Sequence, residues 1–431
     1  MKTEWKKFAL MAVVFIACYF LPVGRPRFDN AVMESLGLVR WYAREHVVYC
    51  LIPAFFIAGA IAVFINKSAV LKYLGPKANK PLAYGVASVS GSILAVCSCT
   101  VLPLFAGIYR MGAGLGPASA FLYAGPAINV LAIVLTAKVL GLHIGIARAF
   151  GAIVFSLAIG LLMHAIFGRK EHEEENVWAS TPEKKNSRSL RQNAIYFLVM
   201  VGILVFANWG KPVQQTGLWY YIYLAKWLFT GFLALMLAVI LVMWFNIKVW
   251  KMIFASAPVI ILACFMPHEH MFLFGVGIVG FSILTGFDQG ECGEWFRAAW
   301  DFAKQIMPLL FLGVLFAGLM LGRPGHDGLI PSHWVTVLVG GNSIRANLFA
   351  SVAGALMYFA TLTEVPVLRG LMDGGMGNGP ALALLLAGPA LSLPSMLVIH
   401  SVIGAKRTIV YVLLVSMMAA ISGIIYGFIS G

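Results

Sequence analysis

The chain contains an internal repeat, in which helix-breaking residues recur at one constant spacing. An offset of 263 residues superposes three prolines and five glycines of the first half on identical residues of the second half. Paired apolar segments that Gly and Pro interrupt at matching places in two halves are typical of membrane transporters, and the interruptions mark the binding site. The superposed pairs are Pro103 and Pro366, Pro117 and Pro380, Pro126 and Pro389, Gly91 and Gly354, Gly107 and Gly370, Gly114 and Gly377, Gly125 and Gly388, and Gly141 and Gly404.

The composition predicts a membrane protein. Hydrophobic residues make up 61% of the 431 residues and charged residues only 11%. Several windows approach twenty apolar residues, which is long enough to cross a bilayer as a helix. The formal net charge of +14 is carried mainly in short loops, where basic residues set the orientation in the membrane. We therefore expect an all-α, polytopic membrane protein in a lipid bilayer, with no nucleic-acid partner.

Two pairs of apolar segments are too short to cross the membrane singly. They flank Cys97-Ser98-Cys99 and Thr361-Leu362-Thr363-Glu364, and each pair is either one broken helix or a re-entrant hairpin. Two hairpins leave about eleven full crossings and place 20 of the 31 Lys and Arg residues on the cytoplasmic side. Through-crossings would place the basic segment 168–191 outside, against the positive-inside rule. We prefer the hairpins, which make the two repeats inverted relative to each other.

These spans divide the chain into five segments. The expected segments are an N-terminal anchor helix with an amphipathic stretch (1–46), transmembrane repeat 1 (47–167), a charged cytoplasmic linker (168–192), central transmembrane helices (193–304) and transmembrane repeat 2 (305–431).

Cys97 and Cys99 are the leading candidates for substrate contacts. Non-helical backbone at membrane depth is tolerated only beside protein or a water-filled cavity, so a hairpin tip is expected to line a cavity. In an extended stretch, residues two apart point to the same side, which would bring both sulfurs together. Thr100, the next residue in the chain, is a further candidate contact. Two neighbouring thiolates suit a soft metal or metalloid ion. The alternative is that both cysteines are small, buried apolar side chains.

A second interruption follows downstream, where Ala124-Gly125-Pro126 breaks an apolar run. Unwound backbone beside an amide can offer polar groups to a substrate, so Pro126 and Asn129 are candidate binding residues. Ser392 is the counterpart of Asn129 at the same offset. The alternative is a kinked helix, with Asn129 hydrogen bonded across a helix interface.

The second hairpin differs from the first, because it lacks the cysteines and carries Glu364 where the first has Val101. A carboxylate in an apolar hairpin is expensive and is a functional candidate by default. Glu364 could carry a proton or bind a cationic substrate, whereas a structural alternative pairs it with Arg369 or Arg110. Two polar neighbours are further candidate contacts, Thr361 and Thr363.

No motif indicates an enzyme. The chain has no Walker A pattern, dinucleotide fingerprint or nucleophile elbow, so we expect neither catalysis nor a bound cofactor.

Three neighbouring motifs resemble the ArsP and YraQ type of predicted permeases. They are Cys97-Ser98-Cys99-Thr100-Val101-Leu102-Pro103-Leu104, Gly112-Ala113-Gly114-Leu115-Gly116-Pro117 and Phe121-Leu122-Tyr123-Ala124-Gly125-Pro126-Ala127-Ile128-Asn129. The resemblance is strongest over residues 90–140, weaker over 346–405, and does not clearly cover 193–300.

This resemblance implies efflux of trivalent organoarsenicals, and some relatives are proposed to move copper or zinc. By position, the paired cysteines of the family fall on Cys97 and Cys99, and its Pro and Asn on Pro126 and Asn129. We therefore expect a secondary permease of the inner or plasma membrane that exports a thiophilic metalloid or soft metal species, coupled to proton entry at Glu364. The alternatives are a permease for a small organic or sulfur-containing solute, and a membrane thiol-redox protein. An assembly of identical chains is compatible with either class.

Overall fold

The computed structural model is built from α-helices. It describes residues 19–65, 67–75, 78–94, 98–128, 130–179, 189–210, 216–322, 326, 328–330, 338–357, 364–373 and 375–430, together with residues 5, 8, 11, 12, 15 and 16. Within these residues the only strand-like pairing is a pair of isolated bridges from Met376 to Gly340 and Gly341.

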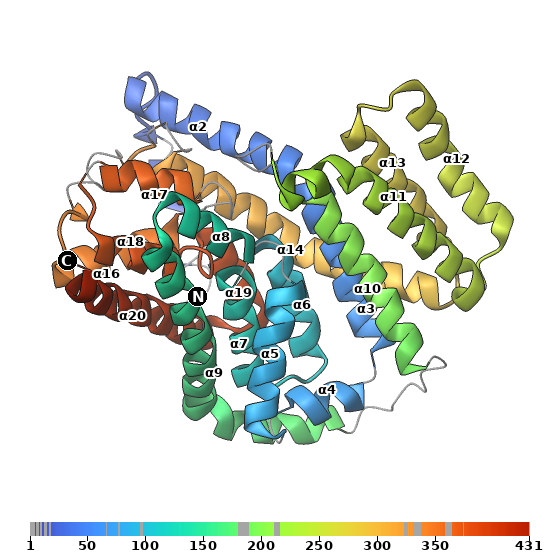
Figure 1. Cartoon of the computed structure of the whole chain (residues 1–431), viewed down its shortest axis with the longest axis horizontal. Coiled ribbons are helices and arrows are strands. Elements are labelled where there is room, and N and C mark those ends of the chain that lie inside the picture. The colour runs from blue at the N-terminus through green and yellow to red at the C-terminus, as the bar shows by residue number, and fades with distance from the viewer. Residues whose placement is uncertain are drawn as a thin grey trace.

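The first half of the chain forms the helices of repeat 1 and the segment that leads into it (Figure 1). The helical path from Pro26 to Phe64 is continuous, so residue 46 lies inside it. The bounds are α2 (Pro26–Tyr42), the π-helical stretch η1 (Ala43–Leu51), α3 (Ile52–Phe64), α4 (Lys67–Leu74), α5 (Lys80–Leu94), α6 (Ser98–Arg110), α7 (Leu115–Ala127), α8 (Val130–Val139) and α9 (Leu142–Ala179).

The second half contains the central helices and repeat 2. Figure 1 shows α11 to α13 on one side of the molecule and α16 to α20 on the other, with α3, α10 and α14 between them. The bounds are α10 (Leu190–Ala207), α11 (Leu218–Phe245), α12 (Val249–Phe265), α13 (His270–Gly286), α14 (Glu291–Leu321), α16 (Ile344–Leu356), α17 (Glu364–Asp373), α18 (Asn378–Ala387), α19 (Leu393–Ile403) and α20 (Ala405–Ser430).

Helix starts recur at the sequence offset. Adding 263 to the first residues of α7, α8 and α9, which are Leu115, Val130 and Leu142, gives the first residues of α18, α19 and α20. Gly141 and Gly404, directly before α9 and α20, have φ of +106° and +82°, in the left-handed region that glycine tolerates without a steric penalty. The helix-breaking residues that define the sequence repeat therefore also mark where these helices begin.

There are two short helix pairs, α5 with α6 and α16 with α17. Within each pair, the segment before the first helix lies close to the segment after the second. In the first pair, the Gly114 amide after α6 donates to the Leu74 carbonyl before α5, at 2.7 Å. In the second pair, the Gly377 amide after α17 lies 3.5 Å from the Val339 carbonyl before α16. At about 1.5 Å per residue, even the 15-residue α5 spans only about 22 Å of a hydrocarbon core about 30 Å thick. This is the geometry expected of hairpins that return to their starting side.

The described helices include five that are long and apolar enough to cross a membrane, or six if α7 and α8 form one bent span. The axes of Leu115–Ala127 and Ala132–Val139 are inclined by 44°. Six shorter apolar helices of 10–17 residues accompany them. The count of about eleven crossings and the inverted arrangement of the repeats stay predictions.

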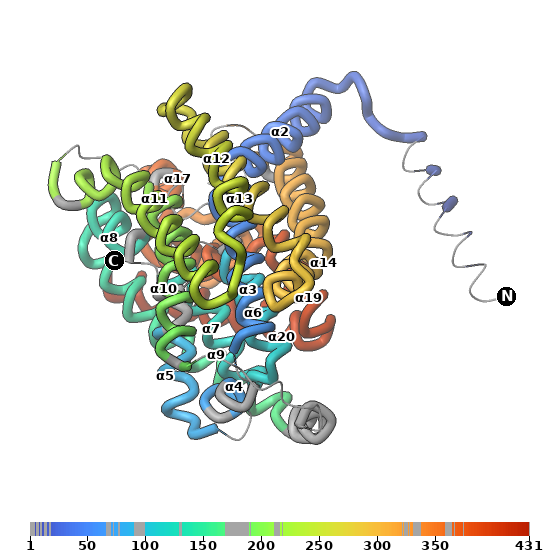
Figure 2. The backbone as a smooth tube through the Cα atoms, turned by 90° about the vertical axis from the view of Figure 1, so that its right-hand side faces the viewer, coloured from blue at the N-terminus to red at the C-terminus, as the bar shows by residue number. Residues whose placement is uncertain are grey.

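The central helices present an apolar exterior to their surroundings. No residue of α12 is buried, and only 17% of the apolar window of α11 is buried within the protein. Figure 2 shows α11, α12 and α13 at the front of the turned view. Exposed side chains such as Phe254, Ile260 and Phe265 would be costly in water but suit lipid.

Aromatic packing joins the central helices to repeat 1. The Trp295 side chain of α14 is fully buried and donates its indole N–H to the Phe56 carbonyl of α3 at 2.6 Å. Phe64 and Tyr196 meet the same indole edge-on. Because a buried indole needs an acceptor, this bond fixes α14 against α3.

Candidate functional site

Several of the predicted contacts fall outside the described residues. This applies to Cys97, Asn129, Thr361 and Thr363, all of which follow or precede a helix end. Cys99 lies in the first turn of α6 by its backbone, and its side chain is outside the described part of the protein. The proposed thiol pair therefore stays a prediction about the first hairpin tip.

Thr100 and Pro126 lie in the buried interior of repeat 1. Thr100 is fully buried near the start of α6. Pro126 is buried at the end of α7, and the helix continues past it by a single residue before turning at Ile128, whose amide still bonds to the Ala124 carbonyl. Proline lacks an amide proton and cannot bond to the carbonyl four residues earlier, so Pro126 weakens the last turn of α7. The predicted interruption is present, shifted to the residues just after Pro126.

Ser392 caps a helix. Its hydroxyl oxygen accepts from the Ser395 amide at 3.2 Å and shares a 2.7 Å hydrogen bond with the Ser395 hydroxyl. The backbone of Ser392 is extended, as expected of the residue before a first helical turn. Ser392 thus stabilises the start of α19 at the interruption between α18 and α19.

Glu364 forms a buried ion pair with Arg148. Its side chain is only 1% exposed at the start of α17, and that of Arg148 in α9 is 0% exposed. The Arg148 Nη2 donates to Glu364 Oε2 at 3.1 Å, and Nη1 donates to Thr136 Oγ1 of α8 at 2.8 Å. Thr136 in turn donates to the Ala132 carbonyl at 2.6 Å. One polar network therefore joins α8, α9 and the second hairpin.

Two buried tyrosines lie near this ion pair. Tyr123 of α7 is within electrostatic range of Arg148, and Tyr411 of α20 is within range of Tyr123. Tyr123 donates to the Leu386 carbonyl at 3.1 Å, and Leu386 is the residue 263 positions later. Tyr123 therefore contacts the residue that corresponds to it at the offset of the sequence repeat.

The expected structural partners of Glu364 were wrong. Arg369 pairs instead with Asp373 on the exposed side of α17, at 3.0 Å. Arg110 donates to Gln305 and lies 4.6 Å from the centre of the Phe302 ring. Arg148 was missed, although an arginine inside the apolar run 142–168 is as expensive as Glu364 is in its hairpin. Applying the same rule to Arg148 would have marked it as a functional candidate, although not as the partner of Glu364.

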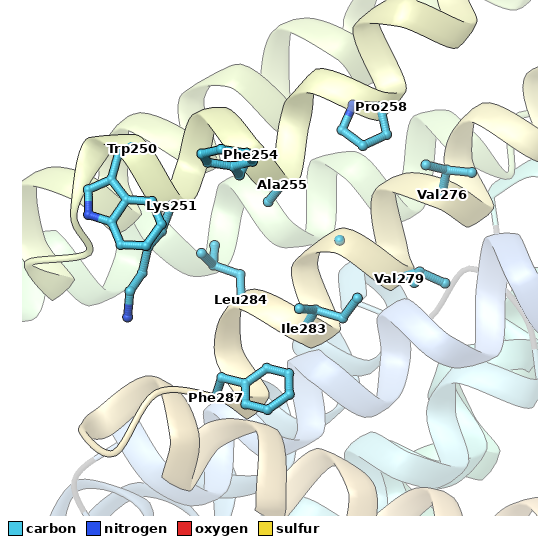
Figure 3. A pocket seen from close by; sticks show the side chains of 11 residues that line it. Trp250, Lys251, Phe254, Ala255, Pro258, Val276, Val279, Ile283, Leu284 and Phe287 are labelled. Atoms are coloured by element: carbon cyan, nitrogen blue, oxygen red, sulfur yellow. The ribbon is translucent and has the colours of Figure 1, made fainter.

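The grooves among the central helices are apolar and separate from this cluster. Figure 3 shows one between α12 and α13, with Trp250, Phe254, Ile283 and Phe287 around it and Lys251 at one end. A larger groove of about 800 Å³ extends between α11, α12 and α13 and the faces of α3 and α10. Neither groove is lined by a residue predicted to contact substrate. Their side chains are those expected to face lipid tails.

Short helix pairs, discontinuous helices beside them and an apolar exterior define the class of this protein: it is a multi-pass membrane permease, which carries a small molecule across a lipid bilayer. The chain belongs to the ArsP_1 predicted permease family, because the model of that family matches residues 33–428. The match includes residues 193–300, which the sequence motifs did not clearly cover.

Two relatives support this family membership. The UPF0718 protein MJ0584 of Methanocaldococcus jannaschii is 40% identical over 401 residues, which is 93% of this chain and 97% of the relative. The UPF0718 protein YraQ of Escherichia coli K12 is 34% identical over 140 residues, which is 32% of this chain and 36% of the relative. No solved structure matches the chain.

Proposed function

We propose that the protein is a secondary permease of the inner or plasma membrane that exports a thiophilic metalloid or soft metal species, with a trivalent organoarsenical as the leading substrate. The observation that carries the transport part of this proposal is the recurrence of a short helix pair followed by a discontinuous helix in both repeats. Such elements bring backbone and polar side chains to membrane depth, where substrate and coupling ions bind.

The chemistry of the substrate is proposed from the first hairpin. Cys97 follows α5 and directly precedes α6 in the sequence, and Cys99 is the second residue of α6. A trivalent organoarsenical with two exchangeable positions can bind two thiolates at once, whereas harder ions prefer oxygen ligands. Thr100, Pro126, Asn129, Thr361, Thr363 and Ser392 are proposed to complete the surroundings of the substrate.

The energy source is proposed to be inward proton movement, with Glu364 as the carrier. Its burial and its position at the start of α17, the second helix of the second hairpin, support this role. Ionisable residues inside membrane proteins are costly and commonly form proton relays. In this scheme the first hairpin handles the substrate and the second handles the coupling ion.

A transport panel tests the proposal. Cells that lack their own exporters would express the protein and be exposed to methylarsenite, arsenite, antimonite, copper, zinc and a simple thiol. We expect resistance and lowered accumulation for a trivalent arsenical, and loss of both in the Cys97→Ser/Cys99→Ser variant at equal expression. Cys264→Ser is the matched control, because Cys264 is an exposed free cysteine far along the chain.

Two other outcomes would replace the metalloid proposal. Undiminished arsenical export by the double variant would remove the thiol site, and flux of another solute that survives thiol alkylation would identify a permease with packing cysteines. A mixed disulfide with a soluble partner, trapped in a single-cysteine variant, would indicate a thiol-redox protein instead.

A further inference from the structure

We propose that Arg148 is a positioning residue that turns the protonation of Glu364 into movement of the second hairpin. The inference rests on the proposed role of Glu364 as proton carrier and adds the residue that responds to it. Arg148 holds the ionised carboxylate from α9, which belongs to repeat 1, while Glu364 begins α17 of repeat 2. Loading a proton on Glu364 therefore removes the ionic contact between α17 and α9.

The guanidinium is itself held firmly in place. The Arg148 Nη1 bonds to Thr136, whose hydroxyl bonds to the Ala132 carbonyl within α8. Helices α8 and α17 are also in direct contact. Arg148 is therefore anchored to repeat 1. When its ion pair with Glu364 breaks, the element that can shift is α17, which has only ten residues.

The equivalent contact, between α6 and α19, has no charged residue at the positions that correspond to Glu364 and Arg148. Helix α6 contacts α19 just as α17 contacts α8. At the offset of 263, Glu364 corresponds to Val101 and Arg148 corresponds to Tyr411. Because only one of the two equivalent contacts carries an ion pair, protonation biases the two repeats in one direction. That asymmetry is what a proton-driven cycle requires.

The electrostatic reasoning gives the sign of the pH dependence. The ion pair is complete while Glu364 is ionised, and it is lost as the pH falls and the carboxyl takes a proton. Because an arginine guanidinium is not deprotonated in proteins, protonation of Glu364 leaves a buried cation without its counter-ion, which is strongly unfavourable. The closed contact is therefore favoured at high pH and opens at low pH.

The other groups around Glu364 do not reverse this sign. Tyr123 on α7 and Tyr411 on α20 are neutral hydroxyls in the neighbourhood of the pair. Helix α18 contributes no titratable side chain, and the charges of α17 itself, Arg369 and Asp373, pair with each other at its exposed end. Lys138 of α8 is exposed.

Amide hydrogen exchange of α17, measured by mass spectrometry on the full chain in nanodiscs without substrate, tests the proposal. Rates would be corrected for the intrinsic pH dependence of exchange. In the wild type we expect exchange in α17 to accelerate by about tenfold as the pH falls. In Arg148→Gln the unpaired charge is the ionised carboxylate, so exchange should be fast at high pH and slow as the pH falls. In Arg148→Gln/Glu364→Gln it should not depend on pH.

The matched control is Arg369→Gln/Asp373→Asn, which removes an exposed ion pair of the same helix and should retain the wild-type pH profile. The inverted profile of Arg148→Gln is the deciding result, because a pair that only stabilises the fold would give uniform loosening. A wild-type profile that is flat, or an Arg148→Gln profile of the same sign as the wild type, overturns the proposal. Since no substrate is present, failure of arsenical transport would leave this result unaffected, and the reverse also holds.

Discussion

At the residue scale, glycine lets helices cross at close distance because it has no side chain. A Cβ added at Gly313 of α14 would lie 2.4 Å from the Cα and 2.9 Å from the nitrogen of Pro394, at the start of α19. Neither atom is the flexible end of a side chain, so the helices would have to separate. Small residues at such crossings allow close backbone packing in membranes, where no hydrophobic force drives helices together.

We predict that Gly313→Ala lowers the stability of the protein by about 1–3 kcal/mol, as overpacking in a tight interior does. The measurement is the thermal unfolding midpoint of the purified protein in detergent. Gly275→Ala in α13 is the matched control, because no atom lies within 4 Å of its added Cβ. An unchanged midpoint for Gly313→Ala would show that α14 and α19 are not in contact at this point.

The sequence could predict the two members of the central ion pair as candidates, but not that they contact each other. Glu364 stands out because it interrupts an apolar segment, and the same reasoning applies to Arg148. What the sequence could not supply is that the two side chains meet, since they are 216 residues apart and belong to different repeats. Nearby arginines, Arg110 and Arg369, were the natural expectation, but each already has a closer partner.

At the element scale, the hairpins show what helix breakers can and cannot reveal. Gly and Pro positions predicted the two interruptions and their spacing, because these residues act locally on the backbone. The predicted return of each hairpin is supported by contacts of Gly114 and of Met376 and Gly377, which join the loops after α6 and α17 to earlier segments. Charge counting favoured that return, since short loops obey the positive-inside rule.

We predict that the bases of the two hairpins face opposite sides of the membrane. Single cysteines at Asn79 and Arg110, both exposed, should react with an impermeant maleimide from the cytoplasmic side only. Cysteines at Ser343 and Asp373, also exposed, should react from the opposite side only. Intact cells compared with inverted vesicles give the measurement, in a Cys264→Ala background that removes an exposed native thiol.

Labelling of Asn79 and Arg110 positions from different sides would show that the first helix pair crosses the membrane. Labelling of all four positions from one side would show that the repeats are parallel rather than inverted. Either result would require a different scheme of alternating access.

At the scale of the whole molecule, the two repeats share the starts of three helices and differ in chemistry. Helix starts recur at the offset of 263, yet one hairpin carries Cys97 and Cys99 and the other carries Glu364. Binding a soft electrophile and moving a proton need different side chains, and a duplicated scaffold can hold each at its own tip. The family match across residues 33–428 covers both repeats.

The most direct test of the central claim is arsenic X-ray absorption spectroscopy on purified protein loaded with methylarsenite. The proposed site predicts two sulfur neighbours around the bound arsenic in the wild type and their loss in Cys97→Ser/Cys99→Ser, with the other four cysteines, Cys18, Cys50, Cys264 and Cys292, left in place. Arsenic with no sulfur neighbours in the wild type, or with both retained in the double variant, would contradict the account.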